Sequence, residues 1–187
     1  MDVSSVTPSP QALKALAHPV RLRMLGLLRL DGPATATTLA GRLGLNTGTT
    51  SYHLRQLAEH GFVVDDPERG NGRERWWRAR HQLTEVDTAS ATTPEEHETY
   101  DAYLQAVAIN YAGNLQASVE QLSLLPAPWR EAGTMSDRVF RLTPARASAL
   151  TDRLLAILDE VEDDDDPEAA PFMVNVNTYR HPRSLAP

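Results

Sequence analysis

Residues 34–80 read ATATTLAGRLGLNTGTTSYHLRQLAEHGFVVDDPERGNGRERWWRAR, and the pattern in this stretch indicates the fold. Its first part predicts a helix from about Thr35 to Leu43, because apolar residues recur there at the spacing of one helical face. The residues of that face are Leu39, Ala40 and Leu43. Gly44 follows where a left-handed residue commonly ends a helix, so a turn is expected there.

A second helix is expected over residues 47–60, with Asn46 or Thr47 as its N-cap. Its core stripe is narrow and consists of Leu54, Leu57 and Ala58. The other side carries small, polar and nearly uncharged residues: Thr47, Gly48, Thr49, Ser51, Tyr52 and Arg55. Small residues near a helix N-terminus let its backbone approach base edges in the major groove of DNA, which is about 12 Å wide.

After Gly61, the segments FVVDD and RERWWRAR predict two strands joined by the loop PERGNG. Arginines stud this hairpin over residues 66–75, namely Arg69, Arg73 and Arg75. A charged hairpin tip suits a phosphate backbone or a minor groove. The neighbours Trp76 and Trp77 point to opposite faces of the second strand, so one of them is expected to anchor the hairpin to the helices. The stretch therefore predicts a winged helix-turn-helix that binds DNA.

Four segments of the chain resemble the ArsR-type winged-helix transcriptional regulators: ALAHPVRLRMLGLL, ATTLAGRLGL, TSYHLRQLAEHGFV and GRERWW. The resemblance covers about residues 10–81 and is loose beyond them. It implies a dimer that binds an inverted repeat. It also implies DNA contacts by Thr47, Gly48, Thr49, Ser51, Tyr52 and Arg55 on the second helix and by Arg69, Arg73 and Arg75 on the wing.

Metal sensing, common in that family, is not expected here. The chain has no cysteine, which excludes thiolate ligands. His97 and Asp101 lie four residues apart and could share a helical face, but a second matching pair is missing. The simpler interpretation is a solvated acidic helix start, so no metal or other cofactor is predicted.

The charge of the chain is unevenly distributed. The formal net charge is −7, yet residues 1–82 hold 11 Lys/Arg and 7 Asp/Glu, a net +4, whereas residues 83–187 hold 7 and 18, a net −11. The basic half is the half with the DNA-binding pattern. Phosphate attraction is screened beyond about 10 Å, so the acidic half need not abolish it.

Length and composition favour a protein of one ordinary domain or two small ones. No run approaches the ~18 apolar residues of a membrane span, and neither a signal segment nor cysteine is present, so a cytoplasmic protein without membrane contact is expected. No phosphate loop, nucleophile elbow or zinc-protease motif occurs, and the protein is not expected to be an enzyme.

Three regions are expected along the chain: a winged helix-turn-helix domain over 1–82, a polar linker over 83–93, and a long helix with an α/β region over 94–187. In the first region, a polar tail precedes a helix from Pro10, which is interrupted at His18-Pro19 because proline disfavours helical geometry in the preceding residue. The stretch after Pro19 is expected to contribute Val20, Leu22, Leu25 and Leu28 to the core.

Thr93, Pro94 and Glu96 predict a capping box at the start of a helix that runs to about Leu125. Apolar residues repeat along it at spacings of three and four: Leu104, Ala108, Tyr111, Leu115, Val119 and Leu122. Such a stripe needs a partner. Packing within the subunit is one interpretation; a homodimer interface is favoured because so long a helix outreaches a small domain.

The last segment predicts a strand in DRVFRL, a helix from Thr143-Pro144, an acidic loop and a strand in FMVNVNTY, together a small α/β layer. The expected fold class is thus mainly α with small β (α+β). Four aromatic residues are expected to form core, with a pocket for a small organic effector as the alternative: Tyr100, Tyr103, Tyr111 and Trp129.

The sequence as a whole predicts a homodimeric regulator that binds double-stranded DNA, with repression as the favoured direction. The alternative is a protein–protein interaction module or anti-repressor that acts through the acidic C-terminal half. Arginines at the wing argue against that alternative, since a DNA mimic would carry acidic residues there.

Overall fold

The computed structural model describes residues 4–69, 74–87 and 90–185. The chain divides into two compact units, Met1–Glu120 and Gln121–Pro187, which are described separately. Helices dominate both units, and the few strands lie in the first, so the expected class, mainly α with small β, is confirmed.

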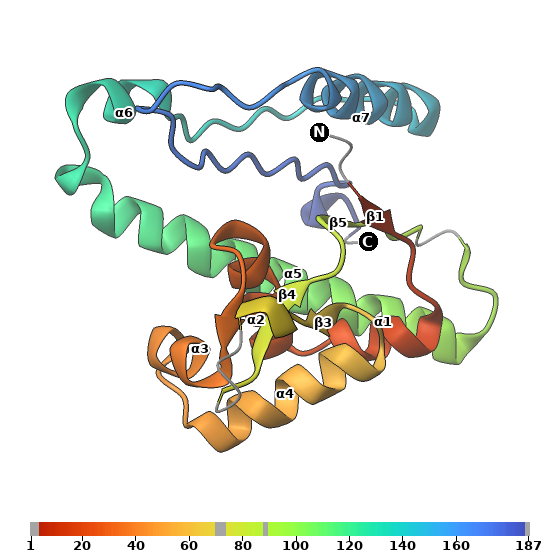
Figure 1. Cartoon of the computed structure of the whole chain (residues 1–187). Coiled ribbons are helices and arrows are strands. Elements are labelled where there is room, and N and C mark those ends of the chain that lie inside the picture. Colours follow the sequence, from red (N-terminus) through yellow and green to blue (C-terminus); the bar gives the residue numbers. More distant parts are fainter. Residues whose placement is uncertain (1–3, 70–73, 88–89, 186–187) are drawn as a thin grey trace. The chain divides into compact units, whose positions relative to one another are not determined.

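The first unit begins with a short strand and continues through a compact group of helices and strands to one long helix (Figure 1). Its elements are β1 Ser5–Val6, α1 Pro10–Leu16, α2 Pro19–Leu30, β2 Ala34–Thr35, α3 Ala36–Leu43, α4 Thr47–Glu59, β3 Val63–Asp65, a 3₁₀ turn Pro67–Arg69, β4 Trp76–Ala79, β5 Leu83–Thr84 and α5 Pro94–Gln121.

The expected hairpin, β3 with β4, belongs to a three-stranded antiparallel sheet in the order β2-β4-β3, with β4 at its centre. Trp77 pairs with Ala34 on one side and with Asp65 on the other. A second, parallel pair joins β1 to β5. The two-residue strands β1, β2 and β5 were not predicted, because a run so short carries no periodicity. β1 lies in the expected polar tail and β5 in the expected linker.

The interruption at His18-Pro19 is confirmed as the boundary between α1 and α2. His18 has extended backbone geometry, with φ −135° and ψ 118°, and its Nδ1 accepts a hydrogen bond from the Val20 amide at 3.2 Å. Pro19 then occupies the first helical position, where its missing amide hydrogen costs nothing. Of the expected core residues of α2, Leu25 and Leu28 are buried, whereas Val20 and Leu22 are half-buried.

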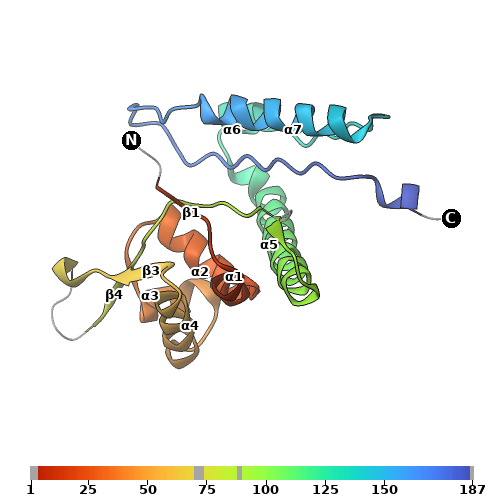
Figure 2. The same cartoon turned by 90° about the vertical axis from the view of Figure 1, so that its right-hand side faces the viewer.

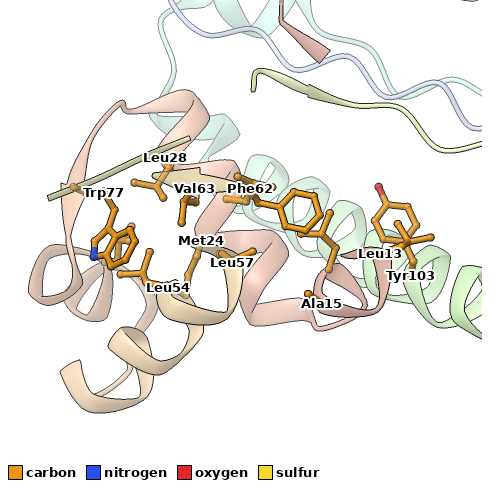
Figure 3. Close-up of a cluster of buried hydrophobic side chains, with 14 of the residues drawn as sticks. Leu13, Ala15, Met24, Leu28, Leu54, Leu57, Phe62, Val63, Trp77 and Tyr103 are labelled. Carbon is orange, nitrogen blue, oxygen red and sulfur yellow. The ribbon is translucent and has the colours of Figure 1, made fainter. Parts of the chain in front are cut away.

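One hydrophobic core spans the first unit (Figure 3). Leu54 and Leu57 of α4 are fully buried in it, beside Met24 of α2. Trp77 lies at one end and Tyr103 of α5 at the other. Trp77 is only 4% exposed and Trp76 is half-buried, so Trp77 is the residue that anchors the hairpin.

The long helix α5 starts with the expected capping box. The Thr93 hydroxyl accepts from the Glu96 amide at 3.2 Å, and the Glu96 carboxylate accepts from the Thr93 amide at 3.2 Å. Hydrogen bonds from the Thr92 amide and hydroxyl and from the Thr93 amide to its carboxylate lower the pKa of Glu96. The helix ends at Gln121 and is followed by a 3₁₀ turn, Leu122–Leu124.

The first half of α5 packs on the winged helix-turn-helix core, through buried Tyr100, Tyr103 and Ala106. Arg29 of α2 adds polar links to the chain before α5, since its Nε donates to the His81 carbonyl at 2.9 Å and its Nη2 to the Thr84 hydroxyl at 2.8 Å. The helix therefore groups with the N-terminal elements, although the sequence-based division placed it with the C-terminal region.

Among its described residues, the second unit contains the α-helices α6 Ala127–Ala132 and α7 Pro144–Asp159 and the 3₁₀ turn Pro182–Leu185. Thr143 is the N-cap of α7. The expected strands in DRVFRL and FMVNVNTY are wrong: residues 137–142 and 172–179 form no ladder. The latter run as an extended segment beside α7 (Figure 2), where Thr178 and Thr151 share a hydroxyl hydrogen bond of 2.9 Å. No residue from 121 to 183 is buried, so alternation in Val174 and Val176 had no packed layer to pair it into a sheet.

Candidate nucleic-acid interface

The start of α4 is shaped by the turn that precedes it. Gly44 adopts the left-handed conformation with φ 64°, as expected for the residue that ends α3. Asn46 caps α4, and its Oδ1 accepts from the Thr49 amide at 2.8 Å. A Cβ at Gly48 would lie 3.3 Å from that oxygen, so glycine gives the cap its room. The first turn of the helix is thereby ordered and open to solvent.

The two faces of α4 match the expected division. Leu54 and Leu57 are buried, and Ala58 is half-buried. Thr50 and His53 are also buried. The six residues expected on the other side are exposed or half-buried: Thr47, Gly48, Thr49, Ser51, Tyr52 and Arg55. Tyr52 is 54% exposed, a large fraction for an aromatic side chain.

A hollow of about 400 Å³ lies where α4, the start of α3 and the base of the wing meet. Its walls mix polar, apolar and charged residues; they consist of Thr35, Ala36, Thr37, Thr47, Ser51, Arg55, Glu74, Arg75 and Trp77. The structure thus brings together four of the predicted site residues, Thr47, Ser51, Arg55 and Arg75. Of the other predicted residues that the structure describes, none lines it.

The wing arginines carry partners within the protein. Arg75 Nε lies 2.9 Å from Asp65 Oδ2, and its guanidinium carbon lies 4.1 Å from the centre of the Trp77 ring. Arg69 Nε lies 3.7 Å from Asp66 Oδ2. Arg73 lies outside the described residues. Arg75 is therefore held at the base of the wing and not at its tip.

Several residues of this surface were missed in the sequence. Thr35 and Thr37 enter it from the start of α3, where the Thr35 hydroxyl accepts from the Thr38 amide at 3.1 Å. The capping pattern of threonine before a helix could have signalled Thr35. Glu74 and Asp65 left no signal, because their role depends on the pairing of β3 with β4.

On the buried side of α4, His53 packs against His18, with ring centroids 4.7 Å apart and the ring planes tilted by 50°. Desolvation lowers the pKa of both imidazoles, and Arg21 lowers them further. Arg21 is tied to this spot by a hydrogen bond from its Nε to the Ala15 carbonyl. His53 Nδ1 is buried without a hydrogen-bond partner. The two rings thus support α4 from within the first unit.

In the described part of the chain, no three side chains of His, Asp or Glu gather in a way that could hold a metal ion. No helix of residues 4–69, 74–87 and 90–185 is both long and apolar enough to cross a membrane.

Comparison with known proteins places the similarity on the same residues. A family model described as a helix-turn-helix domain matches residues 16–65. The HTH-type transcriptional regulator NmtR of Mycobacterium tuberculosis is 38% identical over 66 residues, which cover 35% of this chain and 54% of that protein. The chain thus matches about half the length of this curated relative.

Two solved structures are also similar. One, a possible transcriptional regulator for arsenical resistance, is 27% identical, with a TM-score of 0.33 over 57% of this chain and 94% of that one. The other, a transcriptional regulator from Thermotoga maritima, is 13% identical, with a TM-score of 0.31 over 75% and 73% of the two chains.

Proposed function

We propose that this chain, which resembles the ArsR-type winged helix-turn-helix transcriptional regulators, binds double-stranded DNA in a sequence-specific manner. The observation that carries the proposal is the surface around the hollow. There the open first turns of α4 lie beside two arginines, Arg55 and Arg75, that come from different elements.

The recognition helix of the proposal is α4. Its first turns present Thr47, Gly48 and Ser51, which are small enough for the helix to enter the major groove deeply. Tyr52 projects from the same helix with more than half of its surface exposed. Helix N-terminal amides favour phosphate, so the starts of α3 and α4 suit the backbone on one edge of the groove. Arg69, Arg73 and Arg75 would meet the backbone or minor groove from the wing.

The proposed functional unit is a homodimer. The apolar stripe stays largely exposed: along α5, Leu104 and Leu115 are each 46% exposed and Val119 is 49% exposed, and Leu122 in the 3₁₀ turn that follows is 46% exposed. The buried side of the helix, with Tyr100, Tyr103 and Ala106, is a different face. Large apolar side chains repeated along an open helical face favour a second helix as partner. Two copies would present two α4 helices to an inverted repeat.

Regulation follows from occupancy of such a site. A dimer on an inverted repeat within a promoter would occlude the polymerase, so repression is the proposed direction. The acidic C-terminal half, with a net charge of −11 over residues 83–187, would face away from DNA in this arrangement, because like charge disfavours its approach to phosphate.

Selection of bound fragments from random-sequence DNA at a stated salt concentration tests the proposal. The expected result is one enriched motif with two-fold symmetry, whose half-site centres are about one helical turn, or a multiple of it, apart. Absence of enrichment, together with no retardation of random duplex at low salt, would overturn DNA binding. The interaction module acting through the acidic half would then be the better interpretation.

A further inference from the structure

Arg75 contacts residues of two neighbouring strands, β3 and β4. It precedes β4, and its guanidinium lies over the face of Trp77, which is itself buried. The Asp65 carboxylate contacts the same guanidinium from β3, where Asp65 pairs with Trp77 in the ladder. A cation over an indole face that also meets a carboxylate is held in place. Arg75 therefore has a defined position in the wall of the hollow before any DNA arrives.

A DNA phosphate would replace the Asp65 carboxylate as the anion beside Arg75. Asp65 and Arg75 remain 44% and 57% exposed, respectively, so water screens their attraction. Exposed ion pairs of this kind add little to stability. A phosphate oxygen offers the same guanidinium an equivalent anion, and binding it also releases condensed counterions from DNA. Exchange of one anion for the other is thus physically easy.

The neighbouring residue repeats the arrangement more loosely. Asp66 pairs with Arg69 at 3.7 Å, and the Asp66 side chain is only 14% exposed. Two consecutive acidic residues at the end of β3 therefore hold both arginines of the wing that the structure describes. A wing that serves phosphate contact alone would gain nothing from these acids, because each repels a backbone phosphate.

We infer that Asp65 is an internal competitor for the DNA backbone: it occupies Arg75 in the free protein and must yield it to a phosphate when DNA binds. This inference rests on the proposed function. Its consequence is that the chain binds DNA of every sequence more weakly than its wing arginines would allow. The contribution of phosphate contacts to affinity is then reduced for operator and random DNA alike. Discrimination between DNA sequences therefore depends on the base contacts of α4.

The test compares Asp65→Asn with a matched control in the full-length protein. Asp31→Asn removes the same charge from another exposed ion pair, Asp31 with Arg42, whose atoms lie 2.7 Å apart and which does not line the hollow. Affinity for a fluorescent random-sequence duplex is measured by anisotropy over a salt titration. Asp65→Asn is expected to tighten binding about two- to fivefold relative to Asp31→Asn, the range expected for an exposed pair.

A double-variant cycle with Arg75→Ala locates the effect. In that background Asp65→Asn should bind random duplex no tighter than Asp31→Asn does, because no guanidinium is left to release. Equal melting temperatures of the single variants and the wild type would show that folding is unaffected.

Weaker binding by Asp65→Asn, or binding equal to that of Asp31→Asn, would overturn the inference. The first outcome would mean that the carboxylate positions Arg75 for DNA. A gain that persists in the Arg75→Ala background would overturn it too. These outcomes are distinct from failure of the proposed function, in which the wild type itself binds no duplex at low salt.

Discussion

His53 of α4 lies against His18, the residue that caps α2, with 4.7 Å between the ring centroids and 50° between the ring planes. The contact joins α4 to the joint between α1 and α2. Tyr52 meets the other side of His53 edge-on at 5.4 Å. A residue proposed to read bases is thus separated from the helix joint by a single imidazole.

Stability should fall in mild acid because of this pair. Desolvation lowers the pKa of His53 and of His18 below the ordinary value of 6.5, so the unfolded chain binds more protons than the folded one below that pH. The contribution is fully present above pH 6.5 and is lost as the pH falls through 6.5 toward the lowered pKa values of the folded state. Urea unfolding from about pH 8 to about pH 5 measures this loss.

His53→Phe keeps an aromatic ring in the stack and removes its titration. This variant is expected to lose less unfolding free energy between neutral and acidic pH than the wild type. His97→Gln is the control, since His97 lies exposed at the start of α5. Parallel losses in all three proteins would show that the stacked imidazoles do not govern acid sensitivity.

Loss of the proposed base contacts should be sequence-selective. Ser51→Ala with Tyr52→Ala is expected to cut operator affinity by about ten- to a thousandfold and to affect random DNA much less, because one good base contact discriminates by roughly 1 to 3 kcal/mol. Anisotropy titrations with the selected operator and a scrambled duplex measure the ratio. Equal losses on both duplexes would remove the base-reading role from α4.

The arginines of the wing should act on all sequences. Arg73→Ala with Arg75→Ala is expected to weaken operator and random DNA together and to flatten the salt dependence by about one unit per lost phosphate contact. The slope of log affinity against log salt is the measurement. If affinity and slope both stay at the wild-type values, the wing does not contact the backbone.

The exposed stripe of α5 predicts how the dimer breaks. Leu115→Asp would place a charge in a dry interface at a cost of several kcal/mol, on the order of magnitude of burying an unpaired polar group, so the dimer should dissociate. Light scattering at micromolar protein gives the mass. Ile109→Asp is the control, since Ile109 is 60% exposed on the same helix but off the stripe. A wild-type monomer, or a dimeric Leu115→Asp variant, would locate the interface elsewhere.

The two adjacent tryptophans should differ in their effect on stability. Trp77→Ala is expected to lower the free energy of unfolding by about 3 to 5 kcal/mol, because it empties one end of the core and removes the surface under Arg75. Trp76→Ala should cost clearly less, since Trp76 is half-buried. Denaturant unfolding of both variants measures the difference, and equal losses would contradict the assignment of Trp77 as the anchor.

Helix caps, turns and helix boundaries could be predicted from the sequence. The cap at Asn46, the turn at Gly44, the break at His18-Pro19 and the capping box at Thr93 depend on residues within a few positions of each other. Backbone geometry and capping hydrogen bonds are local, so their patterns are visible in the chain. The two faces of α4 followed from helical periodicity for the same reason.

Contacts between side chains of different helices and strands could be identified only in the folded structure. Whether Trp76 or Trp77 is buried depends on which face of β4 the helices cover, and alternation alone is symmetric. The pairing of Asp65 with Arg75 requires the register of β3 against β4, and the stacking of His53 on His18 requires α4 to pack on the joint before α2. The absent C-terminal strands show the same limit, because an alternating run becomes a strand only where another strand and a core accept it.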